Sequence, residues 1–258
     1  MNDCERWLSA WHDARPGATS RAFLRGKPSS YEWLASAVRP GERALDLACG
    51  DGALLALLAG RGVSGAVGLD MSEGELRAAR ARLGTEARLL QGRAQALPFP
   101  DGSFDVVTCH LALMLMDPVE EAIAEARRVL APGGRFAAVV SDREGSGHED
   151  AWAVVVRHSK ALSFSGPRLG DPRALDAAGL CELLAGFAEV RTEKVVVDLS
   201  GTLDEIGALF HETYNATRLA PAPLQALEEA LRTEWQAMVR DDGTIPCRMG
   251  LLGVVARR

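Results

Sequence analysis

Two glycines and a later carboxylate are the residues whose types and spacing point most directly to ligand binding. Gly50 and Gly52 follow an apolar run at 44–47 and precede a leucine-rich stretch that is typical of a helix. Glycine has no Cβ, so the chain can turn sharply there and a ligand can lie against the backbone. Asp70 ends the next apolar run, where a carboxylate can accept hydrogen bonds from a ribose diol. The pattern predicts the first half of a nucleotide-binding βαβ unit.

These residues require parallel strands to position them, and the rest of the chain supplies candidates. Apolar runs alternate with amphipathic stretches along most of the sequence, which predicts an α/β fold. Strands are predicted near 43–47, 64–70, 87–92, 104–110, 136–140, 188–199 and 247–256. Helices are predicted near 3–12, 31–38, 53–60, 73–83, 118–130, 152–162, 173–185, 202–217 and 222–240.

Two further segments have informative patterns. Residues 92–105 read Gly-Arg-Ala-Gln-Ala-Leu-Pro-Phe-Pro-Asp-Gly-Ser-Phe-Asp, a loop and a Pro/Gly turn that lead into a strand. Residues 128–134 read Arg-Val-Leu-Ala-Pro-Gly-Gly, which ends a helix. With the run Asp46-x-Ala48-x-Gly50-x-Gly52, they make the chain resemble the class I S-adenosylmethionine (SAM) dependent methyltransferases, of the UbiE or methyltransferase-11 kind, over about 40–141. Ala48 stands where that family usually has glycine, and Arg93 where it often has aspartate.

The resemblance implies a fold and a domain organisation. The expected fold is a Rossmann-like, seven-stranded, mostly parallel sheet with an antiparallel last strand, flanked by helices. Residues 1–40 are expected to form an N-terminal helical lid, and 41–258 the SAM-binding domain. Insertions at 142–172 and 200–243 are expected to cover the substrate.

The resemblance also implies SAM as the cofactor, with S-adenosylhomocysteine as its product. Positions that match the family motifs, together with two residues of the expected lid, are the predicted cofactor-binding residues: Arg25, Tyr31, Asp46, Ala48, Cys49, Gly50, Gly52, Asp70, Met71, Ala94, His110 and Leu111.

Methyl transfer from a sulfonium is an in-line displacement, so the protein must mainly align the reacting atoms and exclude water. A hydroxyl or ammonium acceptor must also lose a proton, which requires a general base. The candidate bases are His110, His158 and His211, with Met114 and Tyr214 as candidate substrate contacts. Asp117 precedes Pro118 at a helix start, where capping explains it, so no metal site is predicted.

Composition narrows the class of protein. The net charge is -6 and the apolar fraction 47%, with no apolar run of membrane-spanning length. The five cysteines are widely spaced and include no CxxC pair, which is typical of reduced thiols. These features favour a cytoplasmic protein that acts on a small molecule and binds neither nucleic acid nor membrane. The expected state is a monomer or a homodimer, between which the sequence does not decide.

The sequence therefore predicts SAM-dependent O- or N-methylation of a small molecule, for example in natural-product biosynthesis. Two alternatives stay open. One is a methyltransferase-like protein that binds SAM without transferring its methyl group. The other is an NAD(P)-dependent oxidoreductase, since Gly50-x-Gly52 also opens a dinucleotide motif, although Leu55 stands where that motif has its third glycine.

Overall fold

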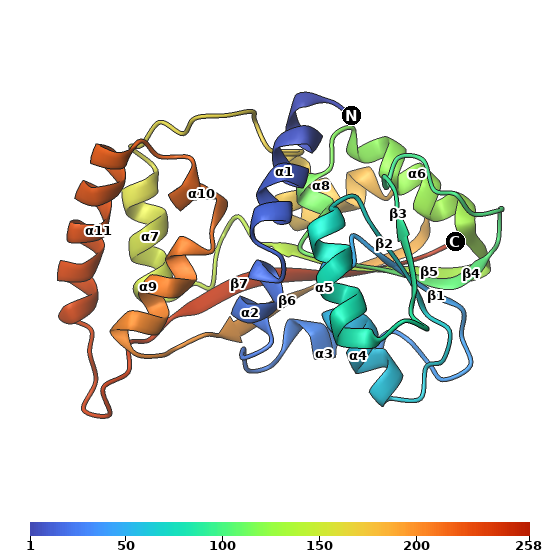
Figure 1. Cartoon of the computed structure of the whole chain (residues 1–258), viewed down its shortest axis with the longest axis horizontal. Coiled ribbons are helices and arrows are strands. Elements are labelled where there is room, and N and C mark those ends of the chain that lie inside the picture. The colour runs from blue at the N-terminus through green and yellow to red at the C-terminus, as the bar shows by residue number, and fades with distance from the viewer.

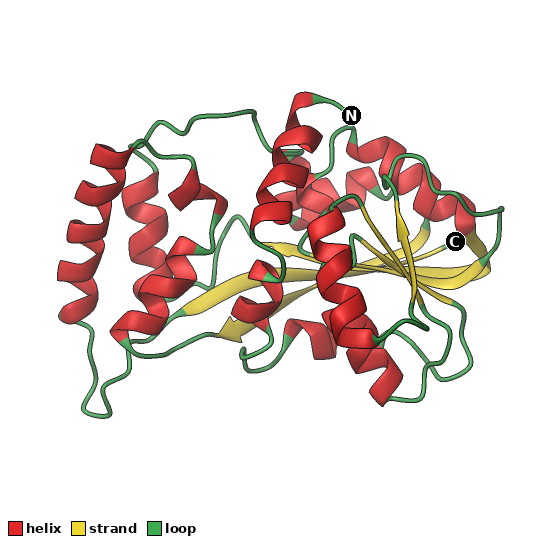
Figure 2. Cartoon of the chain, viewed as in Figure 1, coloured by secondary structure: helices red, strands yellow, loops and turns green.

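The computed structural model describes residues 1–258 and is built on one seven-stranded sheet (Figures 1 and 2). The strands lie in the order β3-β2-β1-β4-β5-β7-β6. Their bounds are β1 (Ala44–Leu47), β2 (Val67–Asp70), β3 (Arg88–Gln91), β4 (Phe104–His110), β5 (Leu130–Ser141), β6 (Ala188–Asp198) and β7 (Arg248–Arg257). Only β7 runs antiparallel to its neighbours, β5 and β6. The predicted Rossmann-like sheet with an antiparallel last strand is confirmed.

Helices cover both faces of the sheet. One core packs α3 (Ser30–Ser36) and α4 (Ala53–Gly60) on one face, with α5 (Glu73–Leu83) beside α4. A second core packs α6 (Val119–Val129) and α8 (Ala177–Leu183) on the other face. The stripe on α6 shows why it packs there, since Val119, Ile123 and Ala126 recur at helical spacing and are all buried.

The remaining helices lie around the strand ends. In Figure 1, α7 (Ala151–Ser159), α9 (Leu203–His211), α10 (Tyr214–Thr217) and α11 (Pro221–Gln236) gather beyond one end of β6 and β7. The N-terminal helices α1 (Asp3–Ala14) and α2 (Ala18–Phe23) lie nearer the middle of the sheet. Short 3-10 turns, η1 (Leu113–Leu115) and η2 (Pro172–Leu175), follow β4 and precede α8. No helix combines the length and apolar composition needed to cross a membrane.

Several predicted element bounds are wrong. The single helix predicted at 202–217 is two helices, because Thr213 ends one turn and caps the next by accepting a hydrogen bond from the Ala216 amide. The helix predicted at 173–185 is η2 followed by α8, where Asp176 caps α8 through the Gly179 amide. The predictions also missed α2 altogether and began β5 six residues late.

Candidate functional site

A pocket with about 970 Å³ of empty space, part of it open to solvent, lies at the carboxyl ends of β1, β2 and β4. Ligands of open parallel sheets bind at this edge. The predicted residues that line the pocket are Tyr31, Asp46, Ala48, Cys49, Gly50, Asp70, Met71, Ala94, His110, Leu111 and Tyr214. Residues of α1 and α2 also line it, so these helices cover the strand ends.

The turn after β1 explains its small residues. Ala48, Gly50 and Gly52 all have positive φ, at 58°, 53° and 76°. Glycine adopts this left-handed region readily, whereas alanine is strained there. Ala48 therefore has a backbone conformation that glycine adopts at a lower cost in conformational energy.

Asp70 faces this turn from the end of β2. Its Oδ2 accepts a hydrogen bond from the Gly50 amide at 2.9 Å, and its Oδ1 accepts one from the Ser72 amide at 2.8 Å. Burial raises the pKa of Asp70, while these amides act in the opposite direction. A carboxylate has about four acceptor positions, so Asp70 retains capacity for a ligand on the pocket side.

Asp46 is a second buried carboxyl in the pocket. It accepts a hydrogen bond from the Thr108 hydroxyl at 3.0 Å, and only 2% of the residue is exposed. Burial raises the pKa of Asp46 to about 7, and the nearby Asp70 acts in the same direction. A cation placed beside Asp46 would favour its ionised form.

His110 ends β4 and is held on one side only. Its Nε2 lies 2.9 Å from the Ser30 hydroxyl, and its ring stacks on Tyr31 with centroids 3.8 Å apart. Its Nδ1 is buried and has no protein partner. Burial lowers the pKa of His110 to about 3, so the ring is neutral at physiological pH.

Arg93 also lines the pocket and is paired with a residue of α1. Its Nη2 lies 2.7 Å from Oε1 of Glu5, a buried residue of α1. Arg93 therefore bonds to α1 at the position where the family often has an aspartate. The Ala94 residue beside it lines the pocket.

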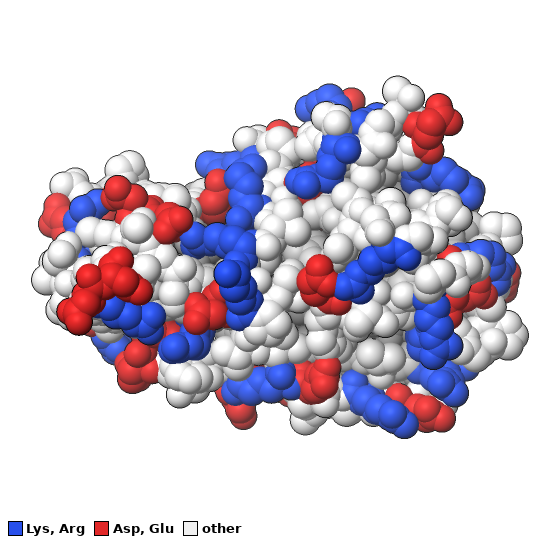
Figure 3. Space-filling model, turned by 90° about the horizontal axis from the view of Figure 1, so that it is seen from below, with Lys and Arg blue, Asp and Glu red and all other residues white.

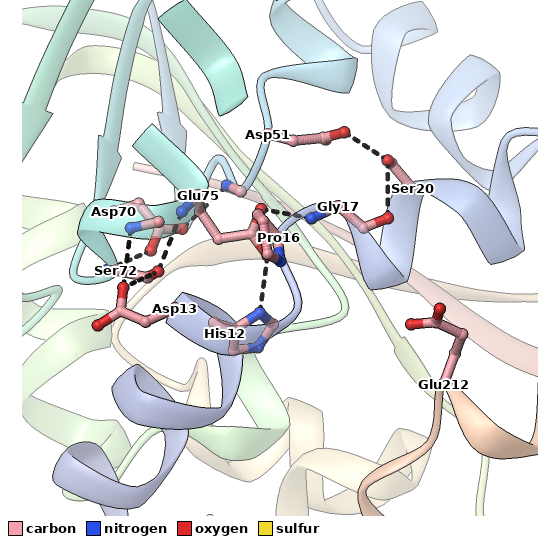
Figure 4. A network of polar contacts seen from close by, with 12 residues as sticks. His12, Asp13, Pro16, Gly17, Ser20, Asp51, Asp70, Ser72, Glu75 and Glu212 are labelled. Carbon is pink, nitrogen blue, oxygen red and sulfur yellow. Dashed lines mark hydrogen bonds and ion pairs between the residues drawn. The ribbon is translucent and has the colours of Figure 1, made fainter. Parts of the chain in front are cut away.

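A network of polar contacts holds α1 and α2 over the pocket (Figure 4). The carboxylate of Asp13 accepts hydrogen bonds from the Ser72 hydroxyl at 2.7 Å and the Gly74 amide at 2.8 Å. The Ser20 hydroxyl of α2 donates to Asp51 at 2.6 Å. These bonds join the first two helices to the turns after β1 and β2.

Glu75, in the first turn of α5, connects that helix to the N-terminal helices. The Ser72-x-x-Glu75 pattern predicts a capping box, and the Ser72 hydroxyl does accept a hydrogen bond from the Glu75 amide. The Glu75 side chain, however, turns to α1, where Oε2 accepts from the Gly17 amide at 2.8 Å and Oε1 lies 2.8 Å from His12 Nδ1. The Ser72 amide is bonded to Asp70 instead.

The sequence interpretation missed His12, Glu75 and Glu5 as pocket residues. One signal was available: Glu5, Leu8 and His12 recur at helical spacing on α1, which places them on one face.

Five predicted site residues do not line the pocket: Arg25, Gly52, Met114, His158 and His211. His158 pairs with Glu234 between α7 and α11, and His211 lies 3.6 Å from Glu228 with 55% of its side chain exposed. Arg25, just after α2, donates to the Leu199 carbonyl at 3.3 Å.

Gly52 and Met114 have structural explanations. A Cβ at Gly52 would come 2.8 Å from the Leu83 side chain, so this glycine allows α4 to approach α5. Met114 packs against both apolar cores. No group of three or more potential metal ligands is present.

Comparisons with known proteins agree with this geometry. The family model described as "Methyltransferase domain" matches residues 45–138. The chain is 35% identical over 173 residues to the ubiquinone/menaquinone biosynthesis C-methyltransferase UbiE of Burkholderia mallei, an alignment that covers 64% of this chain and 68% of the relative.

Solved structures resemble the fold as a whole. The YcgJ protein from Bacillus subtilis is 19% identical, with a TM-score of 0.58 over 89% of this chain and 98% of that one. A SAM-dependent methyltransferase from Thermotoga maritima, described as a possible histamine N-methyltransferase, is 18% identical, with a TM-score of 0.58 over 97% and 99%. At these identities the likeness concerns the fold alone.

Proposed function

The chain belongs to the class I SAM-dependent methyltransferases, and from this premise we propose that it methylates a small molecule at an oxygen or nitrogen atom. The enzyme uses SAM as its methyl donor. The observation that supports the small-molecule proposal is that α1, α2 and α10 line the pocket together with the strand ends. We call these three helices the cover of the pocket. A covered pocket suits a compact acceptor better than a polymer.

The residues of the pocket fit SAM on two observations. Asp46 and Asp70 place two buried carboxyls where a cationic ligand would be stabilised. The turn at Ala48 to Gly52 exposes backbone against which a ligand can lie. We assign the ribose hydroxyls to Asp70, the adenine edge to the backbone at Ala94, and the amino acid end of SAM to the wall formed by Asp46, Tyr31 and His110.

When bound, SAM supplies a methyl group activated by its sulfonium. The protein aligns the acceptor with that methyl group and keeps water out. Leu8 of α1 and Leu111, Leu115 and Met116 after β4 make much of the pocket wall apolar. The neutral His110 adds a hydrogen-bonding nitrogen without adding a charge.

The surface is consistent with an acceptor that is not a nucleic acid. On the face in Figure 3, one band of basic side chains is flanked by acidic ones, and charges of both signs are mixed elsewhere. The net charge of the chain is -6. A phosphate backbone is usually bound by a continuous basic face.

Calorimetry tests the cofactor assignment. Asp70→Ala should weaken binding of SAM and S-adenosylhomocysteine about 10- to 100-fold, because hydrogen bonds to a charged group are lost. Asp241→Ala removes an exposed carboxylate by the same substitution and should leave binding unchanged. Equal binding by the wild type and Asp70→Ala would contradict the assignment.

A labelling experiment tests the activity. The enzyme is incubated with [methyl-¹³C]SAM and a small-molecule extract of the source cells, and labelled products are identified by NMR and mass spectrometry. A labelled O-methyl or N-methyl compound supports the proposal. The absence of any labelled small molecule, under conditions where SAM binds, would refute it.

The named relative supplies a second candidate. The Burkholderia protein is described as a C-methyltransferase, and similarity over 68% of its length favours carbon as an alternative acceptor atom. The same NMR spectrum distinguishes the two, because a methyl group on carbon resonates well apart from one on oxygen or nitrogen.

A further inference from the structure

Three polar side chains form a chain across the pocket. Glu75 of α5 contacts His12 of α1, with 2.8 Å between Oε1 and Nδ1. His12 Nε2 in turn lies 2.9 Å from the hydroxyl of Tyr214 on α10. All three residues line the pocket, and Figure 4 shows His12 directed at Glu75 beside the Asp70 end of β2.

The direction of the hydrogen bonds follows from the donors available. An ionised Glu75 can only accept, so a neutral His12 must carry its proton on Nδ1. Its Nε2 is then an acceptor, and the Tyr214 hydroxyl must be the donor. Glu75 is held on its other oxygen by the Gly17 amide at 2.8 Å, which fixes the orientation of the whole chain.

Tyr214 is the member of the chain that is free toward the pocket. Its O–H group donates to His12 and its oxygen has no other protein partner, so the oxygen can accept a hydrogen bond from a ligand. The rings of Trp7 and Trp11 lie 5.9 Å and 4.6 Å from the Tyr214 ring and hold it in place. Burial raises the pKa of Tyr214, so it stays a neutral hydroxyl that can pass a proton on.

No other histidine has this arrangement. His110 has only a serine hydroxyl as partner, and burial lowers its pKa to about 3, which makes it a weak base. His148, His158 and His211 lie outside the pocket. His12 alone combines a place in the pocket, a buried carboxylate partner and a hydroxyl on its other nitrogen.

We propose that Tyr214 and His12 form a proton relay that deprotonates the methyl acceptor, with Glu75 as the positioning residue. The inference rests on the proposed O- or N-methylation. The acceptor's O–H or N–H bond breaks and its proton passes to the Tyr214 oxygen, while the Tyr214 proton passes to His12 Nε2. The acceptor atom forms a bond to the methyl carbon as the carbon–sulfur bond breaks, and its electron pair stays on sulfur.

The charges around His12 support an imidazolium at the end of this step. Glu75 is in direct contact, and the carboxylates of Asp13 and Asp70 are near enough to interact with His12. The opposing charges on this side are Arg15, which lies over the Trp11 ring beside His12, and Arg77, which acts on Asp13. The Glu5–Arg93 ion pair also lines the pocket. The relay suits acceptors that are protonated at neutral pH, such as phenols and alkylammonium groups, and is superfluous for carboxylates, which are already ionised.

Kinetics on the acceptor isolated from the labelling experiment test the relay. His12→Gln and Tyr214→Phe should lower kcat about 10²- to 10³-fold at pH 7. The loss should shrink as the pH approaches the acceptor's own pKa, because the acceptor then ionises in solution. A loss that is the same at every pH indicates a structural role and would overturn the proposal, as would unchanged kcat.

Two controls separate folding from chemistry. Binding of S-adenosylhomocysteine should stay within about threefold of the wild type in both variants, since neither is assigned to the cofactor. His148→Gln removes an exposed histidine by the same substitution and should leave kcat unchanged. If a variant fails to bind S-adenosylhomocysteine, the more conservative Glu75→Gln takes its place in the kinetic comparison.

An NMR experiment tests the relay without any acceptor, so its outcome is independent of the proposed function. In ¹⁵N-histidine-labelled enzyme bound to S-adenosylhomocysteine, His12 should be protonated on Nδ1 with Nε2 as a hydrogen-bond acceptor. Tyr214→Phe should move the Nε2 resonance of His12 and leave that of His148 in place. A His12 protonated on Nε2 with a bare Nδ1, or a resonance indifferent to Tyr214→Phe, would refute the relay even if methyl transfer is observed.

Discussion

Gly74 lies against the backbone of Asp13 so closely that a Cβ at position 74 would come 2.7 Å from the Asp13 Cα. The Gly74 amide also donates to the Asp13 carboxylate at 2.8 Å. The first turn of α5 can therefore approach the end of α1 this closely only because residue 74 has no Cβ.

This contact makes Gly74→Ala a test of the cover. Alanine favours a helix, but here it must displace the backbone of α1, so we expect a loss of about 1–3 kcal/mol in the free energy of unfolding. Weaker SAM binding should accompany it. Gly207→Ala, in α9 with open space around it, should instead gain up to about 1 kcal/mol. Urea denaturation and calorimetry measure both, and a gain from Gly74→Ala would contradict the contact.

Asp46 should make the stability of the SAM-free enzyme depend on pH. Burial raises its pKa to about 7 in the folded protein. Its contribution is therefore fully present below about pH 4, the pKa of an unfolded aspartate, and is lost as the pH rises through 7. Asp46→Asn does not titrate, so its stability relative to the wild type should rise between pH 4 and 8.

The size of this change is limited by the pKa shift, at most on the order of 4 kcal/mol. Urea denaturation of both proteins at several pH values measures it, and the asparagine can still accept the Thr108 hydrogen bond. A difference between the two proteins that stays constant from pH 4 to 8 would show that Asp46 titrates normally.

Ala48→Gly should stabilise the protein. The φ of 58° at Ala48 is a conformation in which a Cβ costs about 1–2 kcal/mol. Glycine removes that strain, and the greater freedom of glycine in the unfolded chain offsets about 0.5–1 kcal/mol of the gain. We expect a gain of about 1 kcal/mol in the free energy of unfolding. Ala56→Gly, inside α4, is the matched control and should lose about 1 kcal/mol. Thermal denaturation that shows both variants destabilised would exclude strain at Ala48.

The ion pair between Arg93 and Glu5 should stabilise the contact between α1 and the loop after β3. Glu5 is buried and accepts hydrogen bonds from Arg93 Nε at 2.8 Å and from the Asn2 amide at 2.8 Å. Since Arg93 is about one-third exposed, solvent screens the pair, and we expect a coupling of about 1 kcal/mol. A double-mutant cycle with Arg93→Ala and Glu5→Ala measures it, and additive effects would show that the pair contributes nothing.

Local signals sufficed for the sheet and for the rim of the pocket. The strand 44–47, the turn through Gly50 and the carboxylate at Asp70 lie within one βαβ unit, so their pattern reveals their arrangement. The bounds of the later helices were harder to predict from the sequence, because a single capping residue such as Thr213 decides where α9 ends and α10 begins.

The contacts between the cover and the strand ends could not be predicted in this way. His12 and Glu75 are 63 residues apart, and His12 and Tyr214 are 202 apart. Nothing in the spacing within α1 indicates which residue of α5 or α10 will meet it. In the sequence His12 resembles a surface residue. It is a pocket residue only because α1 packs across the strand ends.

The hydrogen bonds of Asp13, Ser20 and Glu75 also have a kinetic meaning. Because they hold the first two helices over a pocket that is only partly open to solvent, we expect some of them to break when a spent donor is exchanged for a fresh one. We therefore expect each exchange to include an opening and a closing movement of these two helices, separate from the methyl-transfer step.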